Sequence, residues 1–221
     1  MRRKQIFLSL FIVTLFIQSC IYISKGQNQP SKIVRADLTK VESDVLKEMN
    51  HARTNPKAYA KKLKRILSYY DGNLLKYPGR IPLRTKEGPG AVKEAIEYLE
   101  NVEAVGPLKS SKGMSRAAMD LVKDQGPKGS VGHTGSDGSS PFDRINRYGK
   151  WLVTAGENIS YGQNTGEDIV IQLIIDDGVP SRGHRKNIFN GSFKVAGIAF
   201  GSHKRYRAMC VIDYAGGYRE K

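Results

Sequence analysis

The spacing of apolar residues changes halfway along the chain, and this change limits the folds that the chain can adopt. In the first half, apolar residues recur at the spacing of an amphipathic helix, over about residues 38–49, 58–70, 91–102 and 113–125. The second half contains apolar, β-rich runs at residues 151–154, 195–200 and 208–214, with one more helical segment at 167–176. Helices followed by interspersed strands predict an α+β domain built of stacked layers.

Length and composition are typical of a globular domain. The chain has 221 residues, which is enough for one domain with a sizeable core and a short appendage. A hydrophobic fraction of 39% and a charged fraction of 26% fit neither a disordered chain nor a protein with several membrane spans. Two cysteines are too few for a disulfide-stapled scaffold or a cysteine-rich zinc module. The hydrophobic core must therefore hold the fold together.

The chain is strongly basic, with 36 Lys and Arg against 21 Asp and Glu, a net charge of +15. This balance favours anionic partners such as lipid headgroups or an envelope polymer. Five basic residues surround an apolar helical stripe within residues 57–65. They could face anionic lipid, teichoic acid or nucleic acid, but we expect an ordinary solvated helix face. Nucleic acid is not expected as a partner, because the N-terminus predicts export.

The N-terminus has the pattern of a secretory signal. Arg2, Arg3 and Lys4 precede an apolar run over residues 6–17, which is shorter than the roughly 20 residues of a membrane-spanning helix. We therefore expect residues 1–20 to act as a signal and residues 21–37 to form a polar tether. The mature protein is expected to be extracellular, periplasmic or anchored to a membrane by lipid.

Cys20 determines which of these locations applies. The residues before it resemble a bacterial lipobox, with the small Ser19 directly before the cysteine, so Cys20 is a candidate for lipidation. The alternative is ordinary cleavage near Ser19 or Gly26, which would leave a free secreted protein. Cys210, in an apolar run, is expected to be a buried core thiol.

The candidate functional residues are two histidines with acidic neighbours. His133 lies in a glycine-rich loop, Glu157 follows an apolar run, and His184 follows a helical segment that ends at Asp176 and Asp177. Two imidazoles and nearby carboxylates could hold a divalent metal, or they could form acid–base pairs. Each histidine could equally be an ordinary hydrogen-bonded residue. The spacing alone does not decide among these interpretations.

Five sequence motifs, in this order, resemble the CAP superfamily of cysteine-rich secretory, antigen 5 and pathogenesis-related 1 proteins, and in particular its cysteine-poor bacterial branch of SCP-domain proteins. The motifs lie at residues 50–60, 132–135, 156–159, 183–188 and 195–214. The resemblance covers residues 38–217 and leaves an inserted loop and helix at about 71–106 outside the minimal domain. It implies a three-layer α-β-α sandwich around a mostly antiparallel sheet.

The resemblance also implies a groove that holds two histidines and two acidic residues, with a divalent cation, zinc above all, bound there in several members. His133, Glu157 and His184 match three of these four positions. For the fourth, the sequence offers Asp176 and Asp177, and helical phase favours Asp177. The predicted metal site is thus His133, Glu157, Asp177 and His184.

Two functions of different class follow from the resemblance. One is a non-enzymatic binding module that takes a lipid, an anionic envelope polymer or another protein in the groove. The other is a metal-dependent hydrolase, a peptidase or esterase, in which a bound metal activates water and a carboxylate serves as base. We expect the binding module, because the resemblance supplies no settled reaction.

Overall fold

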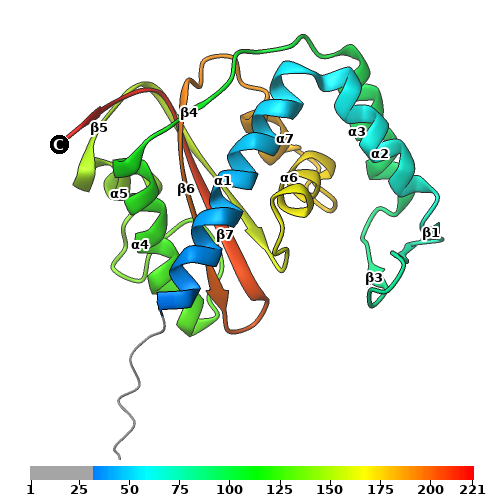
Figure 1. Cartoon of the computed structure of the whole chain (residues 1–221), viewed down its shortest axis with the longest axis horizontal. Helices are drawn as coiled ribbons and strands as arrows, with labels where there is room; N and C mark the ends of the chain where they lie inside the picture. Colours follow the sequence, from blue (N-terminus) through cyan, green and yellow to red (C-terminus); the bar gives the residue numbers. More distant parts are fainter. Residues whose placement is uncertain (1–31) are drawn as a thin grey trace, which may run out of the picture. The chain divides into compact units, whose positions relative to one another are not determined.

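A computed structural model describes residues 32–221, with the side chains of residues 40–221 (Figure 1). The expected signal segment with its candidate lipidation site, Cys20, lies outside the described residues, as does most of the expected tether. Residues 32–221 form one compact unit. The following description applies to this unit.

A four-stranded sheet forms the centre of the fold. Its strands are β4 (Lys109–Ser110), β5 (Gly149–Tyr161), β6 (Val195–His203) and β7 (Arg207–Glu220). They are arranged in the order β4-β6-β7-β5, so β5 lies at one edge. The strand β7 pairs antiparallel with both β5 and β6, and only the short β4 runs parallel to its neighbour. The sheet is therefore mostly antiparallel, as predicted.

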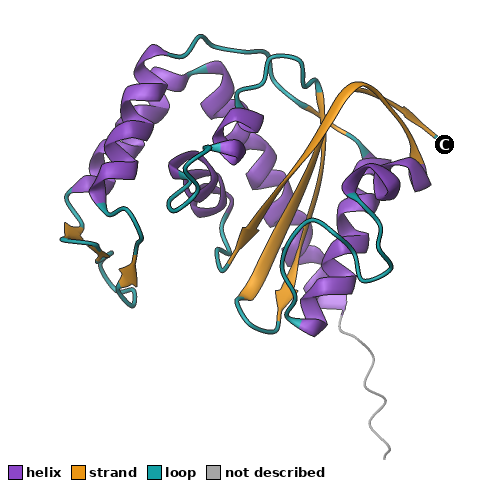
Figure 2. Ribbon diagram, turned by 180° about the vertical axis from the view of Figure 1, so that it is seen from behind, coloured by secondary structure: helices purple, strands orange, loops and turns teal. Residues whose placement is uncertain are grey.

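Helices cover both faces of this sheet, which gives the expected three layers (Figure 2). One face carries α1 (Lys32–Thr54), α6 (Gly166–Ile175) and α7 (Gly183–Ile188). The other face carries α4 (Lys112–Lys128) and α5 (Pro141–Tyr148). No helix within residues 32–221 is both long enough and apolar enough to cross a membrane.

The alternation of side chains along β7 explains why both faces are covered. Cys210 and Ile212 point into the core that contains α1 and α6, whereas Met209 and Val211 pack against α4. Successive side chains of a strand point to opposite faces, so a strand that is apolar on both must be covered on both. The buried position of Cys210 confirms the expected core thiol.

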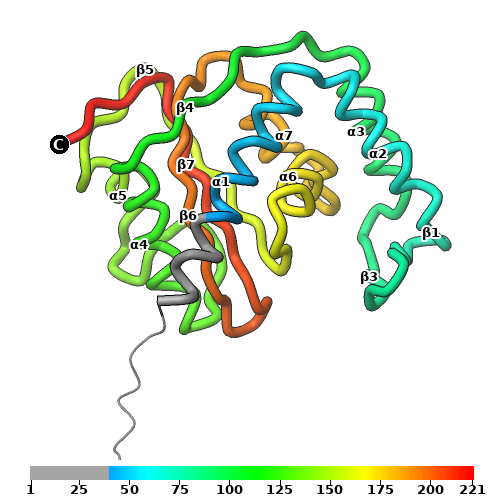
Figure 3. The backbone as a smooth tube through the Cα atoms, viewed as in Figure 1, coloured from blue at the N-terminus to red at the C-terminus, as the bar shows by residue number. Residues whose placement is uncertain are grey.

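The predicted insertion is a structured part of the domain. It contains three short antiparallel strands, β1 (Tyr70–Asp71), β2 (Leu74–Leu75) and β3 (Leu83–Arg84), followed by α3 (Pro89–Asn101). The helix α3 packs on α2 (Pro56–Leu67), and both bury one apolar stripe in the core around α1 (Figure 3). We expected an inserted loop and a helix here, and the short strands lie in the part expected to be loop. Short strands of two residues are too brief for a periodic signal, which explains the difference.

Element ends also differ from the prediction. The helix α1 begins at Lys32, so residues 32–37 of the expected tether belong to that helix. The helices α5 and α7 were not predicted, because they have eight and six residues and little apolar periodicity. The start of α5 does carry a sequence signal. Ser140 and Asp143 form a reciprocal capping box, in which each side chain bonds the backbone N–H of the other.

Candidate functional site

Glu157 and His133 form a hydrogen-bonded pair at the edge of the sheet. Glu157 lies on the edge strand β5, and His133 lies in the loop between α4 and α5. The His133 Nδ1 and the Glu157 Oε1 are 2.7 Å apart. The Glu157 side chain is only 1% exposed, whereas that of His133 is 52% exposed. A buried carboxylate thus holds an imidazole that reaches solvent.

Arg144 holds this pair in place through hydrogen bonds. Its Nη2 donates to the Glu157 Oε2 at 2.7 Å, and both side chains are 1% exposed. Its Nη1 donates to the backbone carbonyls of His133 and Ser139 at 3.0 and 2.9 Å. One guanidinium from α5 therefore orients the carboxylate and also anchors the loop that carries His133. We did not predict Arg144, although the capping box at the start of α5 places it one turn into that helix.

Asp213 is a second buried acid on the same face. It lies directly opposite Glu157 in the pairing of β7 with β5, and the residue is fully buried. Burial raises the pKa of Asp213 well above its ordinary value, the charge of Glu157 raises it further, and Arg144 acts in the opposite direction. Asp213 therefore holds its proton to a higher pH than an exposed aspartate. We did not predict this residue, although it is the single charged residue within the otherwise apolar residues 208–215.

His184 has an equivalent partner in Asp176. The His184 Nδ1 lies 2.6 Å from the Asp176 Oδ1, and the His184 backbone N–H donates to the Oδ2 at 3.0 Å. Asp176 is 2% exposed and His184 25% exposed, counting side chains only. Both oxygens of this carboxylate are therefore engaged by one residue.

The sequence favoured Asp177 over Asp176 as the fourth residue of the predicted metal site, but it is Asp176 that bonds His184 in the structure. Asp177 instead accepts hydrogen bonds from the backbone N–H groups of Lys86 and Glu87, each at 2.7 Å. The helix α6 ends at Ile175, and Asp176 adopts a left-handed conformation with φ 57°. Helical phase cannot be extended past that point, so it could not show which of the two aspartates lies beside His184. Asp177 ties the insertion to the segment between α6 and α7.

The insertion supports the segment that carries His184. Arg182 bonds Glu87 and Glu94 of the insertion, with nitrogen–oxygen distances between 2.6 and 3.2 Å. Arg182 lowers the pKa of Glu87 to about 2, mainly through these hydrogen bonds. Arg185, which is buried, also bonds Glu94 and the carbonyls at the end of α6. The insertion therefore braces the His184 segment through ion pairs.

Consecutive residues of β5 connect the two histidine–carboxylate pairs: Glu157 belongs to the first pair, and Asn158 contacts the second. Glu157 points toward α5, while the next residue, Asn158, points to the opposite face, where it donates to the His184 carbonyl at 3.0 Å.

Within residues 40–221, no three His, Cys, Asp or Glu side chains lie close enough to share one metal ion. A cation held directly by all four predicted side chains does not fit this arrangement. The two predicted acidic ligands, Glu157 and Asp177, already use both of their carboxylate oxygens in hydrogen bonds. The atoms that remain available to coordinate a metal ion are the imidazole nitrogens of His133 and His184.

The first motif, at residues 50–60, has a structural role that we did not predict. Arg53 is fully buried and donates to four backbone carbonyls, those of Gly106, Ile188, Asn190 and Phe193. Asn50 forms two hydrogen bonds with the backbone of Leu108. These side chains join α1 to the chain just before β4 and to the chain just after α7.

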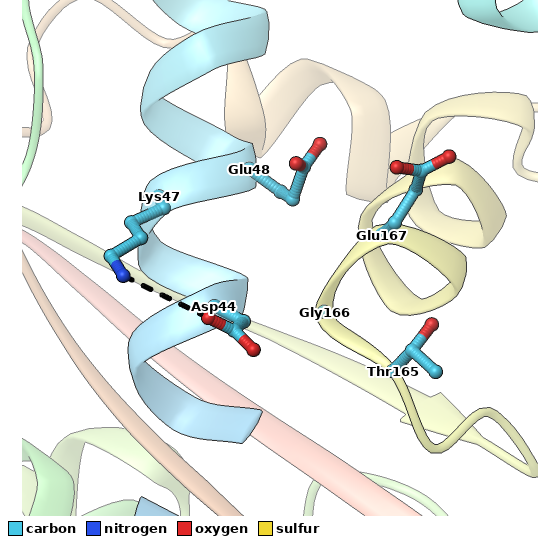
Figure 4. A pocket seen from close by; sticks show the side chains of 6 residues that line it. All are labelled: Asp44, Lys47, Glu48, Thr165, Gly166 and Glu167. Carbon is cyan, nitrogen blue, oxygen red and sulfur yellow. Dashed lines mark ion pairs between the residues drawn. The ribbon is translucent and has the colours of Figure 1, made fainter. Parts of the chain in front are cut away.

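A cavity of about 220 Å³ lies away from the histidines, between α1 and the start of α6 (Figure 4). It is lined by Asp44, Lys47, Glu48, Thr165, Gly166 and Glu167. Lys62 bonds both Glu48 and Glu167, at 2.8 and 3.0 Å. These two carboxylates therefore already have a cationic partner, and we assign the cavity no ligand.

The comparisons with known proteins agree with the sequence motifs. Residues 103–214 match the model of CAP, the cysteine-rich secretory protein family, so the chain belongs to this family. The Bacillus subtilis protein named "Uncharacterized protein YkwD" is 33% identical over 114 residues. The match covers 50% of this chain and 42% of YkwD.

Two solved structures are also similar to this chain. One is an extracellular protein containing an SCP domain from Bacillus anthracis, with 21% identity, a TM-score of 0.41, and coverage of 50% of this chain and 34% of that one. The other is an outer surface protein from Borrelia burgdorferi, with 16% identity, a TM-score of 0.43, and coverage of 53% of this chain and 80% of that one.

Proposed function

We propose that this CAP-family protein is an exported binding module whose ligand contacts the Nε2 atoms of His133 and His184. The observation that carries the proposal is that each Nδ1 lies within 2.7 Å of a buried carboxylate oxygen. An ionised carboxylate can only accept a hydrogen bond, so Nδ1 must carry the proton. In its neutral form, each imidazole then has an unprotonated Nε2 that can bind a ligand.

This is the arrangement in which histidines bind metals. A metal-bound histidine usually donates its other ring N–H to a carboxylate, which fixes the tautomer and makes the ligand more basic. Glu157 and Asp176 would act in this supporting role, and the imidazoles would meet a divalent cation or another electron-poor ligand. Within residues 40–221, no protein group hydrogen-bonds the Nε2 of either His133 or His184.

The state of the carboxylates favours binding over hydrolysis. A general base must reach the proton that it removes, and it must have a free oxygen to accept it. Both oxygens of Glu157 and both of Asp176 are engaged, and the side chains are 1% and 2% exposed. A hydrolase that uses either carboxylate as its base would first have to break these hydrogen bonds.

The charge and the N-terminus support the setting and the class of ligand. The net charge of +15 favours anionic groups of a lipid or an envelope polymer, which could complete the coordination of a cation held by the histidines. The signal-like residues 1–20 support export, and Cys20 supports a lipid anchor.

Calorimetric titration with zinc tests the proposal, with a His133→Ala/His184→Ala variant beside the wild type. Saturable binding that the double variant loses would support it. A His51→Ala variant, which changes a histidine outside the site, should bind like the wild type. Absence of zinc binding by the wild type would contradict the proposal. Equal zinc binding by the double variant and the His51→Ala variant would also contradict it.

A further inference from the structure

We propose that the tip of the small sheet in the insertion, residues 78–84, docks on the surface of an anionic lipid bilayer. The proposal concerns a surface outside the histidine site and does not depend on it. Ile81 and Leu83 insert among the lipids, and basic side chains beside them contact the headgroups.

Two large apolar side chains are exposed together at this tip. Ile81 is 83% exposed and Leu83 is 51% exposed, and every residue from Pro78 to Arg84 is exposed. Single exposed apolar residues are ordinary on protein surfaces, but neighbouring ones mark sites of interaction. The strand β3, which contains Leu83, is exposed at both of its residues.

The charged side chains within residues 74–86 are all basic. Residues 74–86 contain four basic residues, Lys76, Arg80, Arg84 and Lys86, and no acidic residue. Lys76 and Arg80 pair with Asp71 and Asp168. Arg84 and Lys86 make no ion pair within residues 40–221, and both are exposed. An apolar apex beside unpaired basic residues matches the layering of an anionic bilayer, in which charged headgroups lie above hydrocarbon.

The tip is held firmly, which lowers the entropy lost on docking. Leu75 is buried in the main core, and Thr85 is buried and bonds the Asn73 carbonyl through both its N–H and its hydroxyl. Pro78 and Pro82 restrict the backbone of the exposed segment itself. The small sheet lies at the end of α2 and α3 that is farther from the central sheet (Figures 1 and 2).

A bilayer fits these observations better than a protein partner does. The apolar residues form a convex tip, and a protein would need a matching cavity to cover them. Fluid lipid closes around such a tip without a preformed cavity, and interfacial binding grows with buried apolar area and with attraction to anionic headgroups. Each basic residue near such a surface adds to this attraction, and salt weakens it.

The experiment places a fluorescent reporter at the tip of the full chain. Ile81→Trp and Val153→Trp variants are mixed with vesicles of phosphatidylglycerol and phosphatidylcholine whose acyl chains carry shallow bromine atoms, which quench indole on contact. Val153 is a matched control because it is an apolar residue that is 84% exposed at another place. The wild type gives the signal of Trp151. A contact that involves the N-terminus would affect all three proteins equally.

We expect quenching of the Ile81→Trp variant well beyond that of the wild type and of the Val153→Trp variant. Co-sedimentation with these vesicles should fall at least fivefold in an Ile81→Ser/Leu83→Ser variant, while Leu152→Ser/Val153→Ser should leave it unchanged. Pure phosphatidylcholine vesicles should bind at least fivefold more weakly. Absence of extra quenching in Ile81→Trp, equal quenching of both tryptophan variants, or equal binding to neutral vesicles would overturn the proposal.

Discussion

Asp213 and Glu157 lie directly opposite each other on β7 and β5, both residues are buried, and Glu157 bonds His133. Among residues 40–221, the buried cation that pairs with this acidic couple is Arg144, which is bound to Glu157. One positive charge cannot balance two buried negative charges, so the pair retains a proton, and the raised pKa of Asp213 assigns that proton to Asp213. The support of His133 thus includes a neutral acid.

An Asp213→Asn variant should change how stability depends on pH. The folded protein holds a proton on Asp213 that the unfolded chain releases near pH 4, so above that pH folding binds a proton, and the free energy of unfolding falls as pH rises. The slope for this group approaches about 1.4 kcal/mol per pH unit until the raised folded pKa is reached. Asparagine is nearly isosteric with the neutral acid and removes this slope.

Urea denaturation of both proteins from pH 4 to pH 8 measures the effect. The variant should gain stability relative to the wild type as pH rises. Acids with lowered pKa values, such as Glu87, change the free energy of unfolding equally in both proteins, so their effect cancels when the two proteins are compared. A difference between the two proteins that stays constant with pH would show that Asp213 is ionised when folded.

Neighbouring aspartates should differ in their effect on ligand binding. Asp176→Asn removes the carboxylate behind His184 and should weaken zinc binding about 10-fold to 100-fold. Asp177→Asn makes the same chemical change one residue further on, at a side chain that bonds the insertion. It should leave zinc affinity within about twofold. Calorimetry on both variants decides the matter, and a larger loss in Asp177→Asn would reverse our assignment.

Arg53→Lys should destabilise the fold although it keeps the charge. Lysine cannot reproduce the planar fork that reaches four carbonyls, so at least one buried acceptor loses its partner, at a cost of about 2 kcal/mol. The same exchange at the exposed Arg219 should cost less than about 0.5 kcal/mol. Equal midpoints of urea unfolding for the two variants would contradict the role of Arg53.

Gly197→Ala should be strongly destabilising, because α4 packs directly on β6 at this glycine. A Cβ built there would overlap the backbone carbon of Met114, so the helix would have to move, at a cost of about 2 kcal/mol. Gly90→Ala, in α3, meets no atom within 4 Å and should change stability by less than about 1 kcal/mol. Thermal unfolding compares the two. Similar melting temperatures would argue against this close contact.

Long amphipathic elements were predictable because their periodicity reflects their burial. The segment expected at 113–125 is α4, Lys112–Lys128, with Met114 and Leu121 fully buried, as their spacing implied. The run at 208–214 lies in the first half of β7, one of the two inner strands of the sheet. Short elements such as α7 have too few turns to show a period.

The site was predictable only in part, for a different reason. Motif resemblance singled out His133, Glu157 and His184 as candidates, and the structure gives each a hydrogen-bonded partner. The residues that hold them, Arg144 and Asp176, depend on where helices begin and end, and a helical phase says nothing beyond a helix end. Tertiary contacts of this kind join residues far apart in the chain and leave no local pattern.

The central claim is that His133 and His184 present an unprotonated Nε2 to a ligand, and nitrogen NMR of the histidine rings tests it directly. At a pH where the rings are neutral, both should be protonated at Nδ1, and zinc should shift their Nε2 resonances. His203 is an internal control, because its Nε2 donates to the Ser130 carbonyl and its Nδ1 accepts from Arg205 and Tyr206. His203 should therefore be protonated at Nε2 when neutral, and its nitrogen resonances should not shift when zinc is added. Protonation of His133 and His184 at Nε2, or zinc shifts no larger than those of His203, would contradict the claim.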